Sequence, residues 1–365
     1  MKCIFLLSSD YIILAKEEIL GLFSIKNSEL FYNLLIADLD NNVRYLKKVS
    51  KRLALTKCIY RILFDCKPID LEKWMKNFDW NSIYRNNFCL RLNYFNKNLI
   101  INKSTNRKFN KKINKIKIYE EKDLAGYVWR SVNKPKVNLG NPKTRIDLFF
   151  LNGKVYCGLL VYENKGDFES RKSHLRPFPH PSSLHPKLAR ALVNISEVKE
   201  NDLLIDPFCG TGGFLIEAGL MNIKTIGYDV NKIMVRGCKE NLEFFKIKNY
   251  KIKNKDATEI NDKFDYLVSD LPYGLNSNAI ALYEKDWKKH RINLKIQKKD
   301  FIKNLQGFYA RFLGQLRKRL RKKAVIIFPG YVNHRKLLKM SKFKLEKEFS
   351  IYVHRSLTRK IVKIS

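Results

Sequence analysis

The chain has 365 residues, of which 72 are Lys or Arg and 35 are Asp or Glu, and its formal net charge is +37. This length exceeds what one hydrophobic core usually supports, so we expect two or three domains. The basic excess predicts attraction to a polyanion, most simply a nucleic acid. A general bias of the sequence towards Lys, Asn and Ile is an alternative source of part of this charge. No apolar run approaches the roughly 18 residues of a membrane span.

The seven cysteines are scattered and include no Cys-x-x-Cys pair. This spacing argues against a disulfide framework and against a structural zinc site, and it favours a reducing cytoplasm. His174, His180 and His185 lie close together without Cys or acidic partners at ligand spacing, so we interpret them as loop residues and expect no metal site.

The first part of the chain carries the patterns of a mixed α+β region. A strand is predicted over residues 4–7 and an amphipathic helix over residues 15–23, and residues 45–66 combine a basic helix with an apolar strand. The apolar start resembles a signal peptide, but charged residues from Asp10 onwards interrupt it, and a strand fits better.

A hairpin and a strongly basic stretch follow in the same region. Two apolar runs, residues 145–150 and 155–161, flank Asn152-Gly153, which is the signature of a β-hairpin. Residues 95–117 hold eight Lys or Arg and no acidic residue. That composition fits a phosphate-contacting face and a solvated edge equally well.

Residues 163–186 contain four prolines among polar residues, which indicates a linker without helix or paired strand. Beyond it the pattern alternates between strand and helix. Strands are predicted at 203–206, 225–229, 264–270 and 324–328, helices at 214–220, 235–245 and 301–320, and an antiparallel edge at 343–352 and 360–364. Parallel βα units of this kind predict a doubly wound α/β sheet, whose ligands bind at the carboxyl ends of the strands.

A glycine-rich turn, Asp206-Pro-Phe-Cys-Gly-Thr-Gly-Gly213, leaves the first of these strands. Its glycines allow a sharp turn and a close approach to a ligand. Leu215 stands where a dinucleotide-binding fingerprint has Gly or Ala, which disfavours NAD. Asp206, Asp229 and Asp256 form an ordered series of acceptors that suits an ammonium, a ribose diol and an adenine amino group, and S-adenosylmethionine (SAM) carries all three. For Asp229 alone, a helix cap is an equally good interpretation.

A second motif, Asp270-Leu-Pro-Tyr-Gly274, follows the strand at 264–270. An exocyclic amino group of a purine is a weak nucleophile until two acceptors hold its N–H groups. We expect Asp270 and the main-chain carbonyl of Leu271 to be those acceptors and Tyr273 to stack on the base. The common form of the motif has Pro in place of Leu271, but a carbonyl contact does not depend on that side chain. An ordinary strand-end turn is the alternative. Together the two motifs predict methyl transfer to a base nitrogen, with Asp270, Leu271, Pro272 and Tyr273 at the reacting centre.

The chain resembles the archaeal tRNA (guanine-N2) methyltransferases that modify position 10, which combine an amino-terminal THUMP domain with a class I (Rossmann-like) SAM methyltransferase domain. The segments that carry the resemblance are residues 5–8, 141–142, 176–184, 186–194, 206–213, 270–274 and 354–359. The resemblance implies a ferredoxin-like region at 1–60, a THUMP domain at 61–163, a linker at 164–190, and a methyltransferase domain with a seven-stranded sheet at 191–365. A basic stretch at 288–299 has no counterpart that we can place.

The resemblance also implies the cofactor, the substrate and further site residues. The family segment before the glycine turn helps to hold SAM, which adds three candidates here. The predicted cofactor residues are Pro181, Ser182, Ser183, Asp206, Cys209, Gly210, Thr211, Gly212, Gly213, Asp229, Asp256 and Ala257. The implied function is methylation of a guanosine N2 in tRNA, once or twice, by a cytoplasmic monomer or a monomer with a partner subunit. Adenine-N6 methylation of DNA or rRNA, and an RNA-binding protein with a vestigial methyltransferase fold, remain the alternatives.

Overall fold

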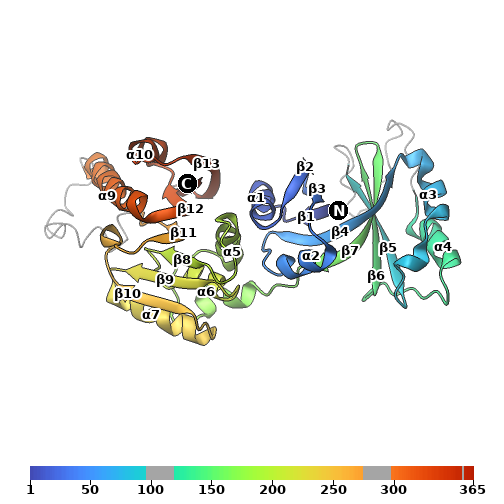
Figure 1. The fold of residues 1–365 in the computed structure, drawn as a ribbon, viewed down its shortest axis with the longest axis horizontal. Coiled ribbons are helices and arrows are strands. Elements are labelled where there is room, and N and C mark those ends of the chain that lie inside the picture. The colour runs from blue at the N-terminus through green and yellow to red at the C-terminus, as the bar shows by residue number, and fades with distance from the viewer. Residues whose placement is uncertain (96–118, 274–296, 356) are drawn as a thin grey trace. The chain divides into compact units, whose positions relative to one another are not determined.

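The computed structural model describes residues 1–95, 119–273, 297–355 and 357–365 (Figure 1). The basic stretch predicted at 95–117 and the one at 288–299 fall almost entirely outside the described residues, as does Gly274. The chain forms two compact units. Unit 1 comprises Met1–Ile12, Phe23–Lys51 and Thr56–Lys165, and unit 2 comprises Ile13–Leu22, Arg52–Leu55 and Gly166–Ser365.

Unit 1 is built on a seven-stranded sheet in the order β2-β3-β1-β4-β7-β6-β5. Its strands are β1 (Lys2–Leu7), β2 (Ile25–Phe31), β3 (Leu34–Leu39), β4 (Thr56–Cys66), β5 (Phe88–Phe95), β6 (Thr144–Leu151) and β7 (Lys154–Glu163). Its helices are α2 (Val43–Ser50), α3 (Leu71–Asn77) and α4 (Glu121–Ser131). Neighbouring strands are antiparallel except β5 and β6, which are parallel. The boundary predicted at residue 60 falls inside β4, so one sheet continues through both predicted regions.

The predicted hairpin is confirmed by β6 and β7. Leu151 pairs with Lys154, and the two turn residues have positive φ angles, 47° at Asn152 and 75° at Gly153. Two consecutive left-handed residues match the right-handed twist of the flanking strands, and Asn and Gly adopt that conformation at the least cost.

Unit 2 contains the second seven-stranded sheet, in the order β10-β9-β8-β11-β12-β14-β13. Its strands are β8 (Leu203–Asp206), β9 (Lys224–Asp229), β10 (Tyr250–Asn254), β11 (Phe264–Asp270), β12 (Leu320–Pro329), β13 (Leu345–His354) and β14 (Leu357–Ile364). Its longer helices are α1 (Ile12–Leu22), α5 (Pro186–Ile195), α6 (Gly213–Gly219), α7 (Lys232–Phe244), α9 (Gln297–Arg319) and α10 (His334–Met340). All pairs are parallel except those of β14, which runs antiparallel to β12 and β13. The strand order reverses between β8 and β11, which is where such sheets bind ligands. This is the class I Rossmann-like arrangement, and the predicted fold class is confirmed.

Some details of the sequence interpretation need correction. The predicted linker ends before residue 190, because α5 begins at Pro186, and proline is favoured at the first position of a helix, where its missing N–H costs nothing. β10 was not predicted, because its Lys-rich sequence buries only Ile252 and so lacks a clear apolar pattern. The short helix α10 was also not predicted.

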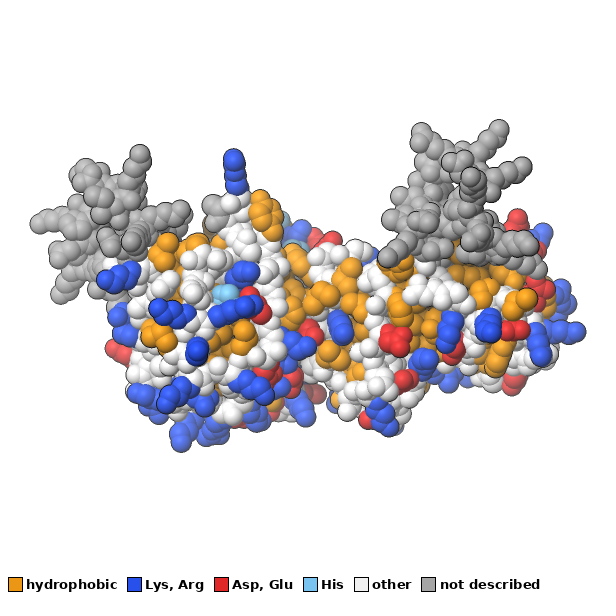
Figure 2. All heavy atoms as spheres, turned by 90° about the horizontal axis from the view of Figure 1, so that it is seen from above, with side chains coloured by type: hydrophobic (Ala, Val, Ile, Leu, Met, Phe, Trp, Pro, Cys, Tyr) orange, Lys and Arg blue, Asp and Glu red, His pale blue; other side chains and the backbone are white. Residues whose placement is uncertain are grey.

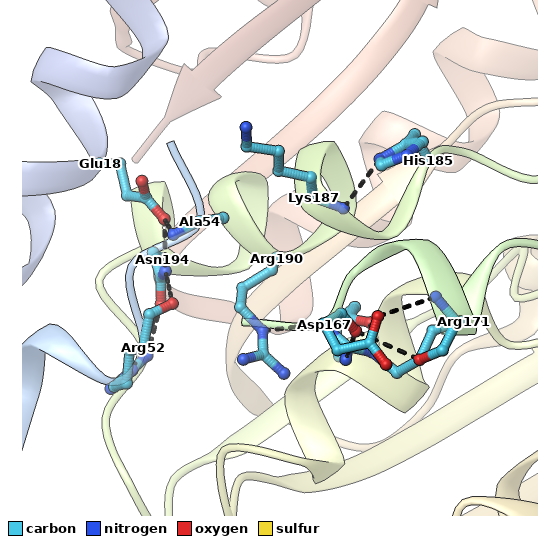
Figure 3. Close-up of polar contacts among 11 residues, drawn as sticks. Glu18, Arg52, Ala54, Asp167, Arg171, His185, Lys187, Arg190 and Asn194 are labelled. Atoms are coloured by element: carbon cyan, nitrogen blue, oxygen red, sulfur yellow. Dashed lines mark hydrogen bonds and ion pairs between the residues drawn. The ribbon is translucent and has the colours of Figure 1, made fainter. Parts of the chain in front are cut away.

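Two short pieces of the amino-terminal region belong to unit 2. In α1 the carboxylate of Glu18 is fully buried and accepts hydrogen bonds from the backbone N–H of Ala54 and Leu55 and from the side-chain amide of Asn194 on α5, each at 2.8 Å (Figure 3). Arg52 in turn donates to the Asn194 Oδ1 at 3.1 Å. This polar cluster joins α1 and residues 52–55 to α5, which accounts for their place in unit 2.

Candidate active site

The glycine turn after β8 has a backbone that only glycine adopts readily. φ is +49° at Gly210 and +86° at Gly212. A Cβ on Gly212 would lie 2.8 Å from the Sγ of Cys238, whereas one on Gly210 would meet no atom within 4 Å. Hydrogen bonds from Gly212 N to the Cys209 carbonyl (2.8 Å) and from Cys209 N to the Tyr228 carbonyl (2.9 Å) hold the turn. The result is a fixed turn whose outer side at Gly210 is open to a ligand.

Asp206, at the end of β8, is a buried carboxylate beside this turn. Its Oδ1 accepts hydrogen bonds from Phe208 N (3.2 Å) and from the Ser269 hydroxyl (2.6 Å). Burial raises the pKa of Asp206 to about 7, and the neighbouring carboxylates of Asp270 and Asp229 add to the rise. A cationic group placed here would reverse that shift, so Asp206 is suited to an ammonium.

Asp229, at the end of β9, supports the turn itself. Its Oδ2 accepts from Gly210 N at 3.0 Å and its Oδ1 from Asn231 N at 2.8 Å. Burial raises the pKa of Asp229 as well. The cap of α7 is Asn231, whose side chain accepts from Ile233 N, so the alternative interpretation of Asp229 as the helix cap is wrong.

Asp256 lies after β10, where its Oδ1 accepts from the backbone N–H and the hydroxyl of Thr258 and so caps a short 3-10 helix at residues 257–259. The next residue, Ala257, is buried. β10 is the next strand after β9 in the sheet, so Asp229 and Asp256 follow neighbouring parallel strands.

The second motif lies at the end of β11, which neighbours β8 in the sheet. Leu271 N donates to the Ile327 carbonyl (3.1 Å), the Tyr309 hydroxyl to the Pro272 carbonyl (2.6 Å), and the Tyr331 hydroxyl to the Tyr273 carbonyl. The Leu271 side chain is buried in the core of unit 2. Packing of this side chain therefore gives residues 271–273 a fixed course without the proline that is common at this position.

Asp270, Tyr273 and Arg359 form one polar cluster. The Tyr273 hydroxyl donates to Asp270 Oδ1, Arg359 Nε donates to the Tyr273 hydroxyl at 3.0 Å, and Arg359 Nη2 lies 3.9 Å from Asp270 Oδ2. Burial raises the pKa of Asp270 to about 6, and the Arg359 guanidinium limits the rise. The Leu271 carbonyl, by contrast, receives no hydrogen bond from the described residues. Ser269 connects the two sites, since it directly precedes Asp270 in β11 and its hydroxyl donates to Asp206.

Comparison with known proteins agrees with this geometry. Residues 173–285 match a family model described as RMKL-like, methyltransferase domain. A tRNA (guanine(10)-N2)-dimethyltransferase from Methanothermobacter thermautotrophicus is 31% identical over 320 residues, which cover 86% of this chain and 84% of that protein. The chain belongs to this family of tRNA guanine-N2 methyltransferases. A relative of the same description from Pyrococcus abyssi is 27% identical over 95% of this chain and 94% of that protein.

The same fold is present in a solved structure. The crystal structure of TrmN from Thermus thermophilus aligns with 100% of this chain and 99% of that chain, with a TM-score of 0.50 and 13% sequence identity. At this identity the likeness concerns the fold alone.

The methyltransferase segment before α5 reaches the glycine turn through one of the three predicted residues. The Ser183 hydroxyl lies 3.0 Å from the Thr211 hydroxyl. Ser182 is exposed and its hydroxyl lies 2.7 Å from His180 Nδ1, and Pro181 is exposed as well. The structure therefore brings Ser183 to the predicted cofactor site, and the roles of Pro181 and Ser182 stay predictions.

Asn241 is a site residue that the sequence interpretation missed. This fully buried side chain on α7 donates to the carbonyls of Thr211 and Phe178 and accepts from Phe178 N, each at 3.0 Å. It thereby fastens the proline-rich segment to the glycine turn. Gly237, one turn earlier, leaves room for the Phe178 ring, since a Cβ there would lie 2.2 Å from it. No local motif marks Asn241, whereas Ser269 had a signal, a hydroxyl next to the motif aspartate in an apolar strand.

Proposed function

We propose that this protein methylates the N2 amino group of guanosine 10 in tRNA, with SAM as the methyl donor, and that it can add a second methyl to the same nitrogen. One observation carries the proposal: a glycine turn suited to SAM and an amino-binding loop lie at the ends of the neighbouring strands β8 and β11, and the hydroxyl of Ser269, which directly precedes Asp270, donates to Asp206. The relatives named tRNA (guanine(10)-N2)-dimethyltransferase supply the position and the number of methyl groups.

The residues around the turn fit the donor. Asp206 would hold its ammonium, Asp229 its ribose hydroxyls, and the segment at Asp256 and Ala257 its adenine. The open side of Gly210 would accommodate the chain between them. When bound, SAM supplies a methyl group on a sulfonium, which makes that carbon strongly electrophilic.

The reacting loop supplies orientation and a proton acceptor. Asp270 and the Leu271 carbonyl would each accept one N–H of the guanine amino group, so that the nitrogen lone pair points away from the ring plane. In the structure the Tyr273 hydroxyl occupies one Asp270 oxygen, so we infer that the substrate amino group displaces it, which frees the ring to stack on the base. Asp270 then takes the proton that the amino group loses.

The amino-terminal half would bind the tRNA. We propose a ferredoxin-like region at 1–60, most of which lies in unit 1, a THUMP domain at 61–163, which lies within unit 1, and a monomeric enzyme. The net charge of +37 supports a polyanionic partner. Lys and Arg side chains are spread over the visible face of the molecule, with Asp and Glu among them (Figure 2). Among the described residues no helix has the length and apolar character of a membrane span.

The proposal is tested with the purified full chain, labelled SAM and an unmodified tRNA transcript under single-turnover conditions. We expect N2-methylguanosine first and N2,N2-dimethylguanosine later, and no label in a matched transcript with adenosine at position 10. Label in N6-methyladenine instead would favour the alternative function, adenine-N6 methylation. If calorimetry shows no SAM binding, a non-enzymatic RNA-binding role replaces the enzyme.

A further inference from the structure

A buried arginine beside the glycine turn has two nitrogens without a partner. Arg176, in the proline-rich segment, is 4% exposed. Its Nε donates to the Arg171 carbonyl at 2.9 Å, but Nη1 and Nη2 are buried and find no hydrogen-bond acceptor within the described parts of the chain. A guanidinium buried in this way is unfavourable unless an anion pairs with it. Nη1 and Nη2 can therefore donate hydrogen bonds to a further acceptor.

The nearest buried carboxylate is already occupied. Glu217 on α6 is fully buried, with its Oε1 2.7 Å from Arg171 Nε and its Oε2 2.7 Å from Arg190 Nε. Figure 3 shows Arg190 on α5 and Arg171 in the segment before it. Two guanidinium groups thus share this carboxylate, and the Arg176 guanidinium makes no ion pair with it. Two acids of the segment that contains Arg176 have other partners: Glu169 pairs with Lys172 and His185, and the Asp167 carboxylate accepts a hydrogen bond from Ser170 N. The positive charge of Arg176 is therefore the one that lacks an ion-pair partner in this group.

The unpaired guanidinium faces the glycine turn. Arg176 Nη1 lies 3.9 Å from the position that a Cβ on Gly213 would occupy, and Gly213 is the last residue of the turn. At the other end of the same turn lies the buried carboxylate of Asp206. One short loop therefore has an anionic group at its start and a cationic group at its end, which is the charge pattern that a zwitterionic α-amino acid requires.

We propose that Arg176 binds the carboxylate of the methionine part of SAM, with its two free nitrogens as donors. The inference rests on the proposed function, since it assigns a further residue to the same donor. Arginine suits this role because its planar fork makes two parallel hydrogen bonds to a carboxylate. Asp206 holds the ammonium of the same amino acid, so the two side chains fix the donor at both ends of the turn.

The test compares two ligands that differ only in the carboxylate. S-adenosylhomocysteine and its decarboxylated analogue are titrated into the wild-type full chain and into Arg176→Met by calorimetry. We expect the wild type to prefer S-adenosylhomocysteine by about 10- to 100-fold, the value of a charge-assisted hydrogen-bonded pair. Arg176→Met should lose that preference while its affinity for the decarboxylated analogue stays unchanged.

Arg171→Met is the matched control, because it removes a partly buried guanidinium of the same segment that is already paired with Glu217. It should leave the ratio of the two affinities unchanged. Arg176→Lys, which keeps the charge and loses the fork, should retain part of the preference and serves if Arg176→Met does not fold. Equal weakening of both ligands by Arg176→Met, or no preference in the wild type, would overturn the assignment while the proposed function stands. Absence of S-adenosylhomocysteine binding to the wild type would overturn both.

Discussion

The two loops of the site are held in place by different means. The glycine turn at 206–213 depends on the left-handed backbone of Gly210 and Gly212 and on a hydrogen bond within the turn, to which hydrogen bonds with Tyr228, Asp229 and Asn241 add. The reacting loop at 270–273 is instead fastened from outside, by Tyr309, Tyr331 and Arg359. A turn of the first kind is sensitive to glycine replacement, whereas a loop of the second kind is sensitive to residues far away in the chain.

The largest expected effect is at the reacting loop. Asp270→Ala removes the carboxylate that we propose as an acceptor for the amino group and for its proton, so kcat should fall by roughly two or more orders of magnitude. Affinity for S-adenosylhomocysteine should stay the same, because the glycine turn does not depend on Asp270 for its shape. Single-turnover rates and calorimetry measure the two quantities. Turnover at the wild-type rate would remove Asp270 from the reacting centre.

A replacement in the glycine turn should act on the affinity for S-adenosylhomocysteine. Gly212→Ala places a Cβ 2.8 Å from the Cys238 Sγ at a φ of +86°, so we expect a loss of about 1 to 3 kcal/mol in stability together with a clear loss of S-adenosylhomocysteine affinity. Gly210→Ala is the matched control, since its φ is also positive, at +49°, but its Cβ meets no atom within 4 Å. Thermal unfolding and calorimetry should show the smaller stability loss for Gly210→Ala. Equal stability losses for the two variants would mean that the contact with Cys238 is relieved at little cost.

The pH dependence of kcat reports on the reacting loop. Burial raises the pKa of Asp270 to about 6, so its carboxylate form is lost, and kcat should fall, as the pH decreases through about 6. The groups that face Asp270 among the described residues are Asp206, Tyr273, Tyr309 and Arg359. Arg359→Met removes the cation that opposes the rise, so the acidic limb of the kcat profile should move up by about one pH unit.

Arg359→Lys is the control for that experiment, because it keeps the charge and should leave the acidic limb nearer to its wild-type position. S-adenosylhomocysteine affinity should be the same in both variants. An unshifted limb in Arg359→Met, combined with a uniform loss of rate at every pH, would indicate a packing role only.

The last prediction concerns stability alone and the Asn241 side chain, which joins the proline-rich segment to the glycine turn. Asn241→Ala leaves the Phe178 N–H and the carbonyls of Phe178 and Thr211 without their partner, so the free energy of unfolding should fall by about 1 to 3 kcal/mol. Lys239→Ala, at an exposed position of the same helix, should change it by less than about 0.5 kcal/mol. Denaturant unfolding measures both. A wild-type stability for Asn241→Ala would show that the amide contributes nothing to the fastening.

Much of unit 2 follows from local pattern. The apolar strands and the glycine turn were predicted because strand period and turn chemistry are properties of neighbouring residues, and Asn152-Gly153 identified the hairpin for the same reason. β10 escaped this reasoning because an edge strand with one buried residue leaves no periodic signal. The helix at residues 15–23 was predicted as amphipathic, but its packing with unit 2 rests on Glu18 and Asn194, which are 176 residues apart.

The sequence by itself therefore determined the class of fold, and it predicted the turn that we propose for the donor and the loop that we propose for an amino group, since the signals for each lie in consecutive residues. Only the tertiary structure brought the Ser269 hydroxyl to Asp206 and the Arg359 guanidinium to Tyr273, 86 positions away in the chain. Only the tertiary structure left Arg176 without an ion pair beside Gly213. The physical reason is that burial and charge balance depend on which distant side chains the sheet brings together, and no local spacing encodes that.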